Sequence, residues 1–125
     1  MMKIINTENA PKAIGPYSQA VMYGNLLFIS GQIAINPLNQ ELINGTIEEQ
    51  TERVMENIKA ILEAAGMQFN NVLKTTIYLK NMDDFQKVNE IYGRYFDNHK
   101  PARVTVGVSN LPKGALIEID VIAGL

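Results

Sequence analysis

Short stretches of alternating apolar and polar residues recur along the chain and predict β-strands. A period of two places successive side chains on opposite faces of a sheet. Gly24-Asn25 separates two such stretches and suits the positive φ angles of a two-residue turn, so we expect a hairpin there. The predicted strands cover residues 3–6, 18–23, 26–29, 72–80, 102–108 and 116–123.

Two stretches with apolar residues at helical spacing predict α-helices. The first begins at Thr46, where Thr46 and Glu49 have the spacing of a capping box, and it ends at Gly66. The second covers residues 84–96, with Asp83 as its expected N-cap. Both stretches are amphipathic, so each helix should bury one face against the strands.

The order of these elements predicts an α+β fold. Residues 36–45 contain Pro and several Asn and should form a loop. We expect the last two strands, 102–108 and 116–123, to pair as a second hairpin. Two helices can cover only one face of the sheet, which gives a mixed β-sheet with two helices packed on one face. The length predicts a single domain over residues 1–125.

The composition excludes several kinds of chemistry. The chain has 125 residues, no Cys, one His and a formal net charge of -2. Disulfides, thiolate nucleophiles, Cys-based metal sites and paired histidines are therefore impossible within one chain. The mild acidity disfavours a nucleic-acid partner, which needs clustered Lys and Arg. So small a chain also has little material to enclose a deep cleft by itself.

The apolar runs are too short to span a membrane, and the N-terminus becomes polar within a few residues. The sequence therefore predicts neither a membrane anchor nor a signal peptide. We expect a cytoplasmic location, and we expect no metal site.

The last two predicted strands carry the most informative pattern. Their wholly apolar faces, which include Val104, Val106 and Val108 on the first, are expected to meet the helices. This arrangement would bring four polar residues together on the opposite face, with Arg103 near Asp120 and Thr105 near Glu118. Two interpretations remain open: a solvated face with weak cross-strand pairs, or a site in which Arg103 binds a carboxylate.

The same face would also carry Leu116 and Ile122. A half-apolar second face in a small chain is typical of an oligomer interface.

Other candidate site residues are weaker individually. Tyr17 follows a constrained Gly-Pro pair that could project its ring, although simple turn chemistry explains the pattern equally well. Ser30 and Gly31 end a predicted strand, and the lack of a side chain at Gly31 allows a ligand to approach the backbone there. A β-bulge explains the glycine as well. Asn89 lies inside the second helix and could simply face water. His99 follows that helix and is expected at the surface.

Several blocks, in order and from end to end, resemble the Rid family of reactive intermediate deaminases. The blocks are Asn9-Ala10-Pro11, Ala13-Ile14-Gly15-Pro16-Tyr17-Ser18-Gln19, Ser30-Gly31-Gln32-Ile33, Lys74-Thr75-Thr76-Ile77-Tyr78-Leu79, Val88-Asn89-Glu90-Ile91-Tyr92, Lys100-Pro101-Ala102-Arg103-Val104-Thr105-Val106 and Leu111-Pro112-Lys113-Gly114-Ala115-Leu116-Ile117-Glu118-Ile119.

The resemblance implies a chorismate-mutase-like fold and a homotrimer with three clefts between subunits. It also implies hydrolysis of 2-imino and 2-enamino acids, such as 2-aminoacrylate, to 2-keto acids and ammonia, without a cofactor or metal. Arg103 would bind the substrate carboxylate, and Glu118 would position or activate water. Other residues would line the cleft: Tyr17, Ser30, Gly31 and Asn89.

The sequence departs from the family at two positions. Many members carry Cys where this chain has Thr105, and Glu where it has Gly107. We interpret Thr105 as a lining residue of the cleft.

Two other functions stay open: a non-catalytic binder of small carboxylates that regulates a partner, and a ribonuclease. The second is disfavoured because one His and a negative net charge supply neither an acid–base pair nor a phosphate track.

Overall fold

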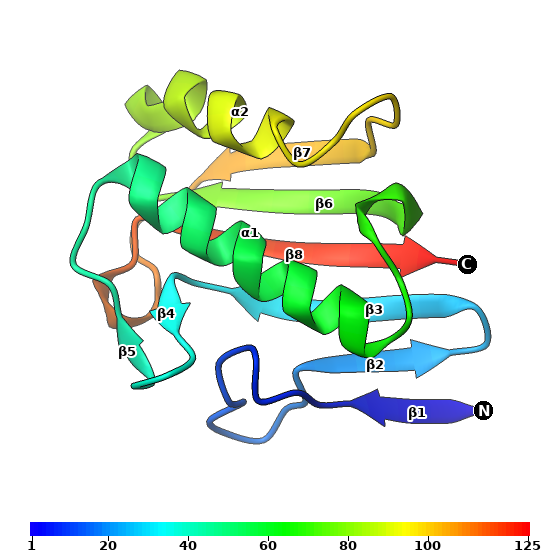
Figure 1. Ribbon diagram of the computed structural model, residues 1–125. Coiled ribbons are helices and arrows are strands. Elements are labelled where there is room, and N and C mark those ends of the chain that lie inside the picture. The colour runs from blue at the N-terminus through cyan, green and yellow to red at the C-terminus, as the bar shows by residue number, and fades with distance from the viewer.

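The computed structural model describes residues 1–125, and six of its eight strands form one sheet (Figure 1). The strands of this sheet lie in the order β1-β2-β3-β8-β6-β7, and β4 and β5 form a separate small hairpin. The strand bounds are β1 Met2–Ile5, β2 Ala20–Tyr23, β3 Leu26–Gln32, β4 Ile35–Asn36, β5 Glu41–Leu42, β6 Val72–Leu79, β7 Ala102–Gly107 and β8 Ile117–Gly124. Helices α1 (Ile47–Ala64) and α2 (Phe85–Gly93) both cover one face, so the predicted α+β arrangement is confirmed.

The first helix forms as its sequence predicts. Thr46 Oγ1 accepts a hydrogen bond from the Glu49 backbone N–H at 3.2 Å, and Glu49 Oε1 accepts one from the Thr46 N–H at 2.8 Å. This reciprocal capping box satisfies two backbone donors that the first turn leaves free. Gly66 follows the helix with φ +74°, a left-handed conformation that favours glycine.

The second helix is shorter than predicted, and its expected cap is wrong. A 3₁₀ turn (Met82–Asp84) precedes α2. Asn81 caps this 3₁₀ turn, because its side chain accepts a hydrogen bond from the Asp83 N–H at 2.9 Å. The helix ends at Gly93. Phe96 nevertheless remains buried in the turn that follows, because its ring packs edge-on against Phe69.

The predicted hairpin between the last two strands is wrong. Strand β7 pairs in parallel with β6 at the edge of the sheet, whereas β8 pairs antiparallel with both β3 and β6. The connection between β7 and β8 is not a tight turn, since it contains a 3₁₀ turn (Pro112–Gly114) in which Lys113 has φ +57°. The alternation of β8, buried at every second residue, suits the central position, where α1 and two neighbouring strands shield it.

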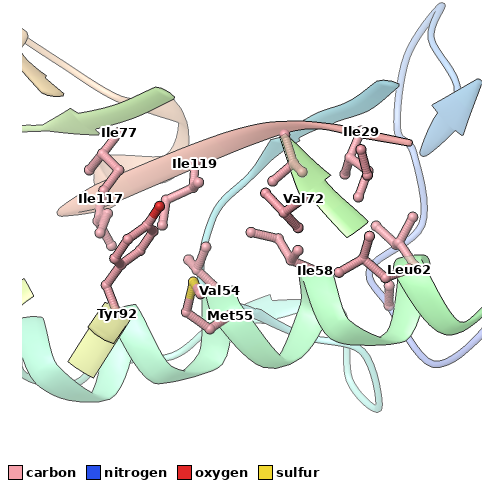
Figure 2. Packing of buried hydrophobic residues seen from close by; sticks show 14 of the residues in the cluster. Ile29, Val54, Met55, Ile58, Leu62, Val72, Ile77, Tyr92, Ile117 and Ile119 are labelled. Carbon is pink, nitrogen blue, oxygen red and sulfur yellow. The ribbon is translucent and has the colours of Figure 1, made fainter. Parts of the chain in front are cut away.

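The core lies between the two helices, α1 and α2, and the face of the sheet that they cover. Figure 2 shows the aliphatic side chains of α1 pointing towards those of the central strands, with Tyr92 from α2 beside them. The fully buried members from α1 and β8 include Val54, Ile58, Ile117 and Ile119. Each such side chain contributes roughly 1.5–3 kcal/mol through removal from water.

Two buried amide side chains fasten loops to this framework. Gln19 accepts from the Thr7 N–H at 2.7 Å and donates to the Thr7 and Pro11 carbonyls at 2.9 and 2.7 Å. Gln50 on α1 accepts from the Leu116 N–H at 3.0 Å. Because an unpaired buried amide is costly, these bonds fix where the two loops lie. Both loops contribute residues to the site described below.

The opposite face of the sheet carries no helix and is largely apolar. Its exposed large side chains include Ile4, Tyr23, Leu26, Phe28, Leu73, Val104 and Val106. The expectation that the valines of β7 face the helices is therefore wrong. The register explains the difference: Val104 lies beside Thr76 and Val106 beside Tyr78, and both partners belong to the open face.

We expect Ile119→Ala to lower the free energy of unfolding by about 2–5 kcal/mol, because Ile119 is fully buried and its truncation leaves a cavity. Denaturant unfolding followed by circular dichroism measures this loss. The control is Leu38→Ala, at an exposed position, which should change stability by less than about 0.5 kcal/mol. Equal stability of the two variants would contradict the central position of β8.

Candidate functional site

A cavity of about 520 Å³, which we name the Glu118 pocket, opens between the N-terminal segment and the loop before β8. Four of the residues singled out from the sequence line it: Tyr17, Ser30, Gly31 and Glu118. The buried amide of Gln19 positions one wall, and the bond from Gln50 to Leu116 holds the backbone just before Glu118. The pocket therefore rests on elements that the core fixes.

Gly31 and Glu118 are in direct contact at the base of this pocket. A Cβ placed on Gly31 would overlap the Glu118 carboxyl group. The register of β3 against β8 also shifts between Ile29 and Gln32, so the bulge expected at this glycine is present. The absence of a side chain at Gly31 therefore leaves space for the Glu118 carboxylate. The bulge itself does not require glycine, because Gly31 is not among the residues with positive φ.

Tyr17 lies in the loop before β2, and Ser30 lies near the end of β3. Gly15 has φ +127°, and the Tyr17 backbone N–H donates to the Gly15 carbonyl at 2.9 Å. This tight turn directs a half-exposed Tyr17 ring into the pocket wall. The Ser30 hydroxyl donates to the Ser18 carbonyl at 2.6 Å, which joins the end of β3 to the same loop.

Burial raises the pKa of Glu118 above its ordinary value, and the nearby negative charge of Asp120 raises it further. Asp120 is itself held in place, because the Tyr78 hydroxyl donates to its Oδ2 at 2.9 Å. Glu118 therefore ionises less readily than a carboxyl in water and exchanges a proton closer to neutral pH. A partly desolvated carboxyl of this kind is typical of acid–base sites.

Arg103 occupies a second cavity of about 490 Å³, the Arg103 pocket, at the edge of the sheet beneath α2. Its Nη1 donates to the Asn89 Oδ1 at 2.7 Å. The guanidinium also lies over the rings of Phe85 and Tyr92, with its Cζ 5.4 and 5.3 Å from their centroids. The remaining N–H donors form no hydrogen bond within the chain and are free to bind an anion.

Arg103 and Glu118 lie on opposite faces of the sheet, so the prediction that they share a face is wrong. Arg103 pairs with Thr75, whose side chain is buried on the helix-covered face, whereas Glu118 pairs with Tyr78 on the open face. Strand β6 also separates β7 from β8 (Figure 1). The expected proximity of Arg103 to Asp120 is wrong for the same reason.

Thr105 shares the helix-covered face with Arg103, next to Ile77, and it lines neither pocket. The predicted neighbourhood of Thr105 and Glu118 is therefore wrong. The Thr105 Oγ1 is buried and has no hydrogen-bond partner.

The structure adds residues that the sequence pattern did not single out for the site. Lys12 and Lys113 line the Glu118 pocket. Lys113 adopts a left-handed conformation that nothing in a Pro-Lys-Gly turn requires, so no sequence signal indicated it. Phe85 and Tyr92 have the helical spacing of core residues, and their contact with Arg103 follows only from the β6–β7 register.

Two further observations describe the chain as a whole. No three His, Cys, Asp or Glu side chains are grouped so that they could hold a metal ion. Neither helix combines the length and the apolar character required to cross a bilayer.

Comparisons with known proteins agree with this architecture. A family model described as endoribonuclease L-PSP matches residues 7–125. A Yersinia pestis protein of the Rid family has a crystal structure that superposes with a TM-score of 0.98, at 50% sequence identity over 100% of both chains. Human 2-iminobutanoate/2-iminopropanoate deaminase is 46% identical over 121 residues, which cover 97% of this chain and 88% of the human protein.

A Lactococcus lactis protein described as a regulator is 56% identical over 122 residues, which cover 98% of this chain and 97% of that protein. These matches place the chain in a class of small α+β proteins that includes an imine deaminase. The chain belongs to the Rid family, also described as endoribonuclease L-PSP.

We expect Asp120→Asn to lower the pKa of Glu118, because the substitution removes the neighbouring charge. The pKa should nevertheless stay above its ordinary value of 4.5, since burial is the larger cause. Titration of the Glu118 carboxyl carbon by NMR measures both values. Asp97→Asn, at an exposed and distant position, should leave the titration unchanged. A wild-type pKa at or below 4.5 would contradict the assigned environment.

Proposed function

We propose that this protein hydrolyses 2-imino and 2-enamino acids, such as 2-aminoacrylate, to 2-keto acids and ammonia. The observation that carries the proposal is a pair of complementary half-sites: an ordered Arg103 with free N–H donors, and a partly desolvated Glu118 in a separate pocket. An arginine of this kind matches a substrate carboxylate, and Glu118 matches the proton transfers of imine hydrolysis. The human deaminase relative supports the same chemistry.

An enamino acid first gains a proton from the solvent at C3 and so becomes the protonated imine. The reaction then needs little beyond positioning, because an imine carbon is already electrophilic. Water adds to C2 of the protonated imine, and Glu118 accepts one proton from that water. Glu118 then returns the proton to nitrogen, the C–N bond breaks, and the hydroxyl oxygen forms the keto C=O. The hydroxyl proton leaves with ammonia as ammonium. Arg103 holds the carboxylate so that C2 stays near the water.

We infer that the complete site forms between two copies of the chain. Arg103 and Glu118 cannot meet within one chain, because they lie on opposite faces of the sheet. Contact between two different surfaces of identical chains is heterologous, and it gives a closed ring when the rotation between neighbouring copies closes. A homotrimer with three clefts between subunits satisfies this requirement. The apolar open face, with exposed Phe28, Val104 and Val106, supplies surface for the contact.

A second candidate function is a non-catalytic receptor for small carboxylates, which the similarity to a Lactococcus lactis regulator favours. The same half-sites would bind a 2-keto acid without turnover. A ribonuclease activity is disfavoured, since the net charge is -2 and the pockets offer no histidine.

We expect Arg103→Ala and Glu118→Gln each to reduce kcat/KM for imine hydrolysis by about 10²-fold or more, because one removes carboxylate binding and the other proton transfer. The assay generates a 2-imino acid in place with an amino-acid oxidase and follows keto-acid and ammonia release. Glu63→Gln, at an exposed position of α1 outside both pockets, is the control for a side-chain change elsewhere in the protein. Binding of 2-ketobutyrate without any acceleration by the wild type would favour the receptor function instead.

We expect the two inactive variants to complement each other. In a ring, each cleft takes Glu118 from one copy and Arg103 from the next, so random mixing of equal amounts restores about one quarter of the clefts. The variants are mixed, dissociated in mild denaturant and reassociated, and activity is compared with each variant alone. Light scattering should give about three times the 13.9 kDa chain mass. A stable monomer, or no recovery on mixing, would refute the shared cleft.

A further inference from the structure

Three residues of α2 converge on the guanidinium of Arg103. Phe85, Asn89 and Tyr92 are spaced four and three residues apart, which places them on one helical face. Asn89 accepts from Nη1 at 2.7 Å, and the two rings lie 5.4 and 5.3 Å from Cζ. The arginine is thus held by one hydrogen bond and two aromatic rings, although its side chain is exposed.

The Tyr92 ring is itself held in place by contacts with Thr75 and Phe96. Its hydroxyl forms a 2.7 Å hydrogen bond with the Thr75 Oγ1, and both residues are buried. The Phe96 ring packs against it with centroids 4.9 Å apart. Thr75 is also the strand partner of Arg103 in the β6–β7 pairing. One residue of β6 therefore supports both the backbone of Arg103 and the ring beneath its guanidinium.

We propose that Tyr92, assisted by Phe85, is a positioning residue that orders the Arg103 guanidinium for its carboxylate ligand. This proposal deepens the proposed function and rests on it. The aromatic rings act on the cation through their faces, so they leave its N–H edges free for a carboxylate. A hydrogen-bonding or acidic partner in the same place would compete for those edges.

The arrangement favours binding because the Arg103 side chain is already ordered. It therefore loses less conformational entropy when the ligand binds. An exposed arginine samples many rotamers, and a ligand must normally select one of them. Here the contacts with Phe85, Asn89 and Tyr92 select it in advance. A role confined to the core would predict lower stability in Tyr92 variants but no specific effect on carboxylate binding.

The test measures the dissociation constant of 2-ketobutyrate by calorimetry, together with kcat and KM for imine hydrolysis. Tyr92→Phe and Thr75→Val remove the same hydrogen bond and should weaken binding by similar factors, about two- to threefold. Phe85→Leu removes a ring that is only partly buried and should weaken it about three- to tenfold. In each variant KM should rise while kcat changes little.

Tyr95→Phe is the matched control. Its hydroxyl donates to Glu56 on α1 at 2.8 Å, so the variant also loses one tyrosine hydrogen bond to a side chain, but away from Arg103. We expect its 2-ketobutyrate binding to equal that of the wild type. Thermal unfolding of every variant shows whether the protein remains folded, and Tyr92→Phe and Phe85→Leu provide independent tests if one of them does not fold.

A double-mutant cycle separates action through Arg103 from a general effect. In an Arg103→Lys background the compact ammonium no longer uses the ring faces in the same way. Adding Phe85→Leu should then cause little further weakening, whereas an indirect effect on the fold would add in full. Full additivity would overturn the proposal, as would wild-type affinity in the Tyr92 and Phe85 variants.

The outcomes also distinguish this proposal from the proposed function. A wild type that binds 2-ketobutyrate but does not hydrolyse imines refutes the deaminase, while the variant affinities still decide the role of Tyr92. Wild-type affinity in the variants refutes the positioning role and leaves the deaminase intact. A wild type that binds no keto acid and hydrolyses no imine refutes both.

Discussion

The structure depends on one constraint, the strict alternation of side chains along β8. Every second residue from Ile117 onward is buried against the helices, so Glu118 and Asp120 must point to the open face. The parallel pairing of β7 sends Arg103 to the other face. The two groups on which the proposed function depends, Arg103 and Glu118, are therefore separated by the sheet itself, and a site that uses both must draw on two copies.

Much of the fold follows from local sequence signals, whereas strand order does not. The capping box at Thr46, the turn at Gly24 and the bulge at Gly31 each depend on residues close in the chain, and each was predictable. The partner of β7 is set by contacts between distant segments. An apolar face on Val104 and Val106 looks the same whether a helix or another subunit is to cover it, so the pattern alone misassigned it.

In the candidate site, too, single residues were predictable from sequence, whereas the contacts between distant segments were not. Glu118, Gly31 and Arg103 stand out from sequence, but the contact between the first two and the aromatic contacts of the third required the structure. The role proposed for Glu118 also opposes stability. Because burial raises the pKa of Glu118, its ionised form lowers stability at neutral pH, and that penalty disappears as the pH falls below the ordinary value of 4.5. Glu118 is therefore retained on this face at a cost to folding.

The central position of β8 has a consequence for how the chain is made. It is the last of the strands to leave the ribosome, yet it lies between β3 and β6. Until it is synthesised, those two strands present unpaired edges and the nascent sheet stays divided into two parts. Closing the sheet joins segments far apart in sequence, and such long-range pairing is slow. The strand that carries Glu118 thus also completes the sheet, and no partially made chain can hold an assembled site.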